Sequence, residues 1–120
     1  ANENNLKKII KIVHPEIRKK INEFLKKNKY KKIVILDIPL LLENKINKKN
    51  DILVYVQSNK IEILARLKKR KNFNPKLLKK FKIVQLPISH KKKKSHFIIK
   101  NDFTKKSVKR GIKNILREIK

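Results

Sequence analysis

Apolar residues recur through the first 30 residues at the spacing of an amphipathic helix, and one proline interrupts them. Leucine, isoleucine, valine and phenylalanine fall at intervals of three and four on both sides of Pro15. This periodicity predicts helix, but proline disfavours helical backbone in the residue before it, which is His14. The pattern therefore predicts two helices, with Pro15 in the first turn of the second, where a missing N–H is tolerated.

Three short segments carry apolar runs without a helical period. They are residues 32–37, 52–57 and 96–100. Continuous apolar runs of this length are typical of strands that are covered on both faces. Between and after them lie helix signals. Asn59 begins a capping box and predicts a helix through Arg70, Asn74 precedes a proline that starts another helix, and Thr104 is expected to cap a last one.

Strands that alternate with helices indicate an α/β fold with a mainly parallel sheet. In such sheets, binding sites gather beyond the carboxyl ends of the strands. At 120 residues the chain has the size of one small domain.

The charge favours an anionic partner, such as a nucleotide, a nucleic acid or a phospholipid surface. Lysine and arginine number 36 against 9 acidic residues, a net charge of +27. Only five of the 36 are arginines, and asparagine and isoleucine are abundant as well. Lysine, isoleucine and asparagine all have A/T-rich codons, so we favour mutational drift onto solvated positions as the explanation for much of the lysine excess.

The absence of cysteine excludes disulfides and thiolate chemistry, which suits a cytoplasmic location. The apolar stretches are too short to span a bilayer, and no signal peptide opens the chain, so we expect a soluble protein without a membrane partner. His90 and His96 have no partner set for a metal site, and we expect no bound structural metal.

Five segments, in order and at matching spacing, resemble the dephospho-CoA kinase family. They are HPEIR at 14–18, DIPLLLEN at 37–44, ILARLKKR at 63–70, VQLPISHKK at 84–92 and FIIKN at 97–101. Members of that family are transferases that use ATP, with Mg²⁺, to phosphorylate the ribose 3′-hydroxyl of dephospho-CoA in the last step of coenzyme A biosynthesis. The resemblance therefore implies a cytoplasmic, ATP-binding P-loop kinase.

The same resemblance implies roles for single residues on the nucleotide side. Arg66 and Arg70 would belong to the lid over the ATP phosphates and act in catalysis, Lys91 would bind the nucleotide, and Asn101 would lie beside the adenine. Guanidinium groups suit such a role because phosphoryl transfer depends on positioning and charge neutralisation. A solvated helix face is the alternative for the two arginines.

On the acceptor side, the resemblance implies contacts with dephospho-CoA from His14, Pro39, Leu40, Leu41 and Glu43. Packing roles without chemistry stay open for His14 and for the proline turn. Residues 1–30 would be part of the helical substrate region, and residues 31–120 the C-terminal part of the kinase core, with lid helices at about 59–92. Ser95 and His96 stand where the family usually has Ala-Asp.

The chain lacks the phosphate-binding loop of such kinases. G-x-x-x-x-G-K-[ST] needs glycines that expose backbone N–H groups to the anion, and the one glycine here is Gly111. We therefore expect an incomplete P-loop NTPase-like fold, a remnant of a parallel sheet flanked by helices. It would be the truncated C-terminal portion of the enzyme, inactive alone, with a missing N-terminal half as its possible partner.

Two other functions remain in view. A basic nucleic-acid-binding protein would use the net charge directly, but aromatic residues make up only 6% and the lysines are spread along the chain. We therefore expect no specific nucleic acid as partner. A related nucleotide kinase for another small acceptor is the second alternative, against which the HPEIR and Pro-Leu-Leu segments argue.

Overall fold

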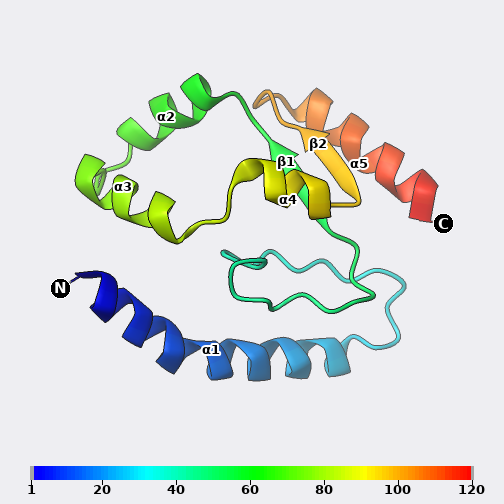
Figure 1. Ribbon diagram of the computed structural model, residues 1–120. Helices are drawn as coiled ribbons and strands as arrows, with labels where there is room; N and C mark the ends of the chain where they lie inside the picture. The colour runs from blue at the N-terminus through cyan, green and yellow to red at the C-terminus, as the bar shows by residue number, and fades with distance from the viewer. Residues whose placement is uncertain (1, 120) are drawn as a thin grey trace. The chain divides into compact units, whose positions relative to one another are not determined.

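The computed structural model describes residues 2–119, of which Asn2, Glu3, Leu6, Lys80, Phe81 and Val84 are described by their backbone alone. The chain divides into two compact units (Figure 1). The first unit extends to Ile46 and the second begins at Asn47.

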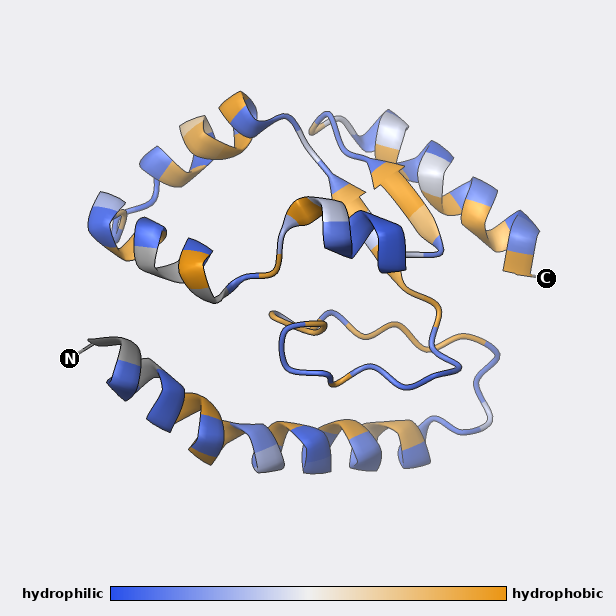
Figure 2. Ribbon diagram, viewed as in Figure 1, coloured by the Kyte–Doolittle hydropathy of each residue, from blue (hydrophilic) through white to orange (hydrophobic). Residues whose placement is uncertain are grey.

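The first unit is built on one long helix, α1 (Asn2–Lys27), which runs through Pro15 without a break. The expectation of two helices was therefore wrong. Proline removes one backbone hydrogen bond and restricts the residue before it, but apolar positions recur along the whole of α1 (Figure 2). The two halves share one amphipathic pattern, and that shared pattern outweighs the local preference of proline.

Residues 32–37 form no strand, so the expected first strand was also wrong. Strand propensity becomes a strand only where a neighbouring backbone supplies hydrogen bonds, and no described segment pairs with these residues. Ile35 is accordingly 83% exposed. After this segment, residues 39–45 fold into a compact turn in which Leu40 and Lys45 adopt positive φ angles of 54° and 51°.

The second unit contains two parallel strands, β1 (Val54–Gln57) and β2 (Phe97–Lys100). Parallel strands need a long crossover connection, and three helices supply it: α2 (Lys60–Lys68), α3 (Pro75–Val84) and α4 (Ile88–Lys94). The helix α5 (Lys105–Ile119) follows β2. The α/β class and the parallel sheet are confirmed, and the structure shows that the second and third expected strands pair with each other.

Local signals explain most of these boundaries. The side chains of Asn59 and Asn74 accept hydrogen bonds from the first-turn amides of α2 and α3, as the sequence predicts. His96 holds the start of the two strands, since its Nδ1 accepts a hydrogen bond of 2.9 Å from the backbone N–H of Leu53. The helix α4 was not predicted, because its lysine run gives no apolar period.

Packing centres on the contact between α5 and β2. Ile99 is 8% exposed and is the one hydrophobic residue classed as buried within the described range. Gly111 of α5 faces it, and a Cβ atom at that position would lie 3.0 Å from Ile99 Cγ2. The helix α5 thus packs closely against β2 of the apolar strand pair (Figure 2), whereas Val56 of β1 is 55% exposed.

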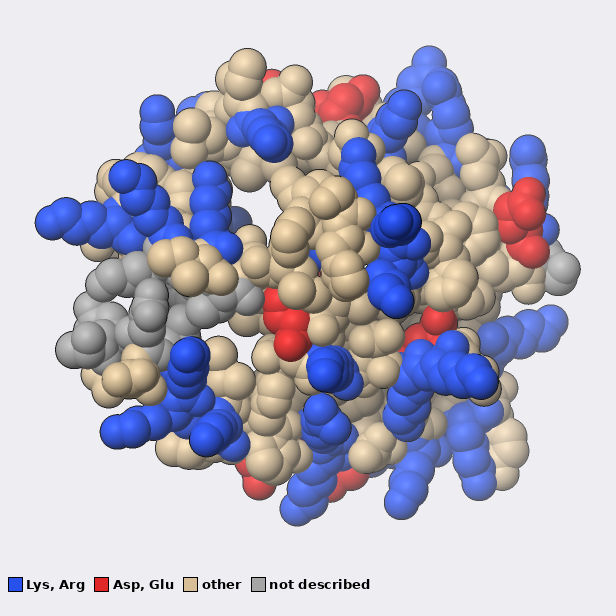
Figure 3. Space-filling model, viewed as in Figure 1, with Lys and Arg blue, Asp and Glu red and all other residues tan. Residues whose placement is uncertain are grey.

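The surface is rich in positive charge. Figure 3 shows lysine and arginine side chains spread over the face in view rather than gathered on a single element. Among the described residues, no helix combines the length and the apolarity needed to cross a membrane.

The turn between β2 and α5 is held by one carboxylate. Asp102 Oδ1 accepts hydrogen bonds from the Thr104 backbone N–H (2.9 Å), the Thr104 hydroxyl and the Ser107 hydroxyl (2.6 Å). Thr104 Oγ1 in turn accepts from the Ser107 N–H, as expected of a capping residue. The hydrogen bonds from Ser107 and then Thr104 lower the pKa of Asp102 from 3.8 to about 2.

We predict that replacing Gly111 with valine destabilises the second unit by about 1–3 kcal/mol, because the new side chain meets Ile99 and cannot fit without displacement. Urea unfolding measures this change. The matched control is Lys113→Val on an exposed position of the same helix, which lowers helix propensity by less than about 1 kcal/mol. Equal losses in the two variants would contradict this packing.

We also predict that Ser107→Ala raises the pKa of Asp102 from about 2 toward 3.8, because the largest cause of its depression is removed. The carboxylate is favoured in the folded chain, so its contribution to stability is present above pH 3.8 and is lost as the pH falls toward 2. Carbon-13 NMR titration of the side-chain carboxyl measures the shift. Ser95→Ala, a serine that bonds the Lys91 carbonyl instead, should leave that titration unchanged.

Candidate nucleotide-binding and acceptor sites

The two parallel strands end side by side, and the next residue continues their pairing. The backbone N–H of Asn101 donates a 2.7 Å hydrogen bond to the carbonyl of Gln57, the last residue of β1. The half-buried Asn101 therefore lies at the carboxyl edge of the strand pair, where ligands of open α/β sheets bind.

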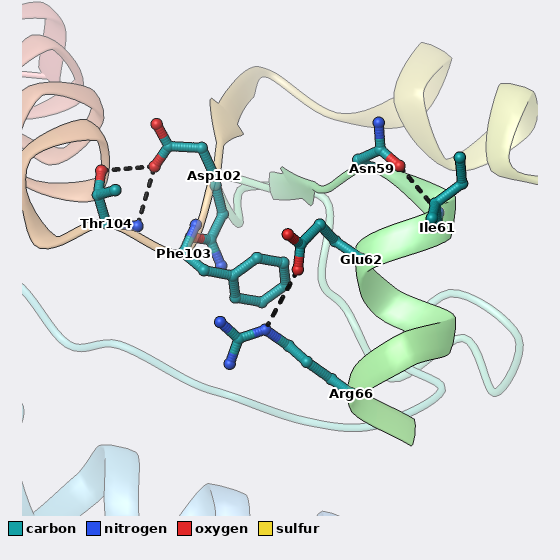
Figure 4. A network of polar contacts seen from close by, with 8 residues as sticks. Asn59, Ile61, Glu62, Arg66, Asp102, Phe103 and Thr104 are labelled. Carbon is teal, nitrogen blue, oxygen red and sulfur yellow. Dashed lines mark hydrogen bonds and ion pairs between the residues drawn. The ribbon is translucent and has the colours of Figure 1, made fainter. Parts of the chain in front are cut away.

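The Asn101 side chain shapes the loop that follows. Its Oδ1 accepts a hydrogen bond of 2.8 Å from the backbone N–H of Phe103. Phe103 has a φ of 65°, a left-handed conformation that is uncommon for a bulky residue. With Asp102 bound to the start of α5, the loop is fixed from both ends (Figure 4).

Arg66 of α2 contacts this loop at Phe103. Its guanidinium carbon lies 3.8 Å from the centre of the Phe103 ring, and its Nε lies 3.9 Å from Glu62 Oε2, one turn earlier in α2 (Figure 4). The side chains of Arg66 and Glu62 are 56% and 59% exposed, so solvent screens their ion pair. Phe103 thus joins two of the expected nucleotide-side residues, Arg66 and Asn101.

The other two nucleotide-side residues occupy different positions. The prediction that α2 runs through Arg70 was wrong, because the helix ends at Lys68 and Arg70 lies in the bend after it. Their spacing of four residues therefore does not place Arg66 and Arg70 on one face of a helix. Lys91 lies in α4, half-buried, and its carbonyl accepts a hydrogen bond of 2.8 Å from the Ser95 hydroxyl.

The acceptor-side residues all belong to the first unit. Pro39, Leu40, Leu41 and Glu43 lie in the turn of residues 39–45. This turn closes on itself through backbone hydrogen bonds of 3.1 Å, from the Asn44 N–H to the Leu40 carbonyl and from the Ile46 N–H to the Leu41 carbonyl.

An arginine of α1 binds the same turn. Arg18 Nη2 donates a hydrogen bond of 3.3 Å to the carbonyl of Asn44, and this contact brings the HPEIR and DIPLLLEN segments together. His14 lies one turn earlier in α1, and its Nε2 is buried without a hydrogen-bond partner in the structure. Because a buried polar atom without a partner is unfavourable, this nitrogen is a candidate ligand contact.

Sequence reasoning missed Glu62 and Phe103 as partners of Arg66. The spacing of four residues between Glu62 and Arg66 is a signal for an ion pair on a helix. Glu62 was instead interpreted only as the acidic residue of the capping box that begins at Asn59. Phe103 gives no comparable signal, because its contact with Arg66 joins residues that lie far apart in the sequence. Within the described part of the chain, no three His, Asp or Glu residues come close enough together to hold a metal ion.

Comparisons with known proteins show the family of this chain. A family model described as dephospho-CoA kinase matches residues 1–107. Curated relatives named dephospho-CoA kinase include one from Wolbachia pipientis wMel, 33% identical over 97% of this chain, and one from Bacillus thuringiensis subsp. konkukian, 34% identical over 98%. The chain spans about 60% of the length of these two relatives. It belongs to the dephospho-CoA kinase family.

Proposed function

We propose that these residues form the lid and the base-binding edge of a dephospho-CoA kinase, which transfers the γ-phosphate of ATP to the 3′-hydroxyl of dephospho-CoA. The observation that carries the proposal is the meeting of Arg66 and Asn101 at Phe103, beyond the carboxyl ends of two parallel strands. A cation for the phosphates and an amide for the base would then lie on the same edge of the strand pair.

On the nucleotide side, Arg66 would neutralise charge on the phosphate in transfer, and Asn101 would lie beside the adenine. Arg70 and Lys91 would add positive charge near the phosphates. Phosphoryl transfer needs little covalent chemistry from the protein, so well-placed cations are the main contribution that this part of a kinase can make.

On the acceptor side, the turn of residues 39–45 and the neighbouring His14 would contact dephospho-CoA. The hydrogen bond from Arg18 to the Asn44 carbonyl joins this turn to α1. The unpartnered Nε2 of His14 would form a hydrogen bond with a polar group of the acceptor. Residues 1–30 would then be part of the helical substrate region, and residues 31–120 part of the kinase core.

Magnesium, which ATP brings to such kinases, has no dedicated site among the residues that the structure describes. The described residues include no cluster of acidic or histidine side chains that could hold it. We therefore assign it no step in the mechanism of these residues.

The phosphates also need a glycine-rich cradle, and these 120 residues cannot form one. Their single glycine, Gly111, lies inside α5 and packs against Ile99. Polypeptide outside these 120 residues would supply the cradle, and these residues alone would be inactive. A cytoplasmic location fits the cysteine-free composition.

We predict that the 120-residue chain mixed with ATP, Mg²⁺ and dephospho-CoA forms no coenzyme A above background. Addition of a polypeptide that carries the glycine-rich loop of the family should restore turnover, measured as coenzyme A by chromatography. In the restored enzyme, Arg66→Lys should lower kcat roughly 10²- to 10³-fold, because the forked donor set is lost while the charge is kept.

The matched control is Arg117→Lys, at an exposed position in the last turn of α5, which should leave kcat unchanged. Robust coenzyme A formation by the 120 residues alone would contradict the need for other polypeptide. Equal kcat for the Arg66 and Arg117 variants would contradict a phosphate-binding role for Arg66.

A further inference from the structure

We propose that Phe103 and Glu62 are positioning residues for Arg66, and that they leave its two terminal nitrogens as the edge that meets phosphate. The inference rests on the proposed role of Arg66 and adds which residues orient the guanidinium and which of its donors remain available. Neither residue belongs to the set that the sequence predicted for the nucleotide side.

Phe103 supplies a platform for the flat face of the guanidinium. The separation of 3.8 Å between the Arg66 Cζ and the ring centre is that of a stacked pair. The backbone that carries the ring is held in place, because the Phe103 N–H donates to Asn101 Oδ1 and the Thr104 N–H donates to Asp102 Oδ1. Stacking on this ring would keep the plane of the guanidinium parallel to the ring face.

Glu62 restricts movement within that plane. Its carboxylate lies on the Nε side of the guanidinium, with 3.9 Å between Nε and Oε2. Figure 4 shows the two terminal nitrogens of Arg66 pointing away from α2 and from this carboxylate. Arginine binds phosphate best through two parallel N–H donors, and the Nη1–Nη2 edge is the pair that Glu62 leaves open.

The arrangement couples the two ends of a bound nucleotide. Asn101 fixes the backbone of Phe103, and Phe103 carries the guanidinium, so a shift on the base side moves the phosphate-binding group. Because the Arg66 side chain is 56% exposed, the stack should contribute a modest amount, about two- to five-fold in phosphate affinity.

The orientation is tested first in the ligand-free chain by NMR. Ring currents of Phe103 should move the Arg66 side-chain proton signals upfield. Phe103→Leu should abolish that shift, and Phe103→Trp should preserve it because the aromatic face is kept. Phe24→Leu in α1, which removes an exposed aromatic ring from the other unit, should change nothing. An Arg66 signal that is the same in the chain and in Phe103→Leu would overturn the stack.

The phosphate edge is tested by titrating the chain with tripolyphosphate at constant salt and following the Arg66 side-chain N–H signals. The terminal N–H signals should move while the Nε–H signal stays nearly still, and in Glu62→Gln the Nε–H signal should respond too. Phe103→Leu should weaken the apparent affinity about two- to five-fold, with recovery in Phe103→Trp. An Nε–H response in the unaltered chain as large as the terminal one would overturn the role of Glu62.

A separate variant distinguishes failure of this inference from failure of the proposed function. Arg66→Lys keeps the charge but removes the forked donors. Unchanged tripolyphosphate affinity in this variant would refute phosphate binding by Arg66, whatever the ring-current result. Lost affinity in Arg66→Lys, together with unchanged affinity in Phe103→Leu, would instead refute the positioning role of Phe103 and leave phosphate binding by Arg66 in place.

Discussion

The hydrogen bond from the Asn101 N–H to the Gln57 carbonyl is the constraint on which the proposed nucleotide-binding edge depends. It carries the pairing of β1 and β2 one residue beyond the strands, so the loop after β2 begins from a fixed point. From this point the contacts continue outward: Asn101 Oδ1 accepts a hydrogen bond from the Phe103 N–H, and the Phe103 ring stacks on the Arg66 guanidinium. A parallel pair of only four residues per strand thereby aligns groups from elements that are distant in the sequence.

The sequence predicted the parts of the fold that local chemistry decides. The caps at Asn59 and Asn74 and the two paired strands follow from short-range signals. The errors concern competition between local preference and longer-range order. Pro15 fails to end α1, and residues 32–37 have the composition of a strand but no described partner to pair with.

The candidate site, too, could be predicted from the sequence only in part. The family pattern placed Arg66 and Asn101 on the nucleotide side, and the structure adds that Phe103 joins them. No periodicity could have shown this contact, because stacking depends on the loop conformation that Asn101 imposes. The end of α2 before Arg70 was missed for a related reason: helix propensity is high in this basic stretch, and only the backbone turn after Lys68 ends it.

The edge of the strand pair should be ordered before any nucleotide binds, and amide hydrogen exchange at Asn101 tests this most directly. Its N–H should be protected to about the same degree as the amides of β2, because it belongs to the same hydrogen-bonded ladder. Exchange of the Asn101 amide at the rate of an unprotected loop, beside protected strand amides, would contradict the account.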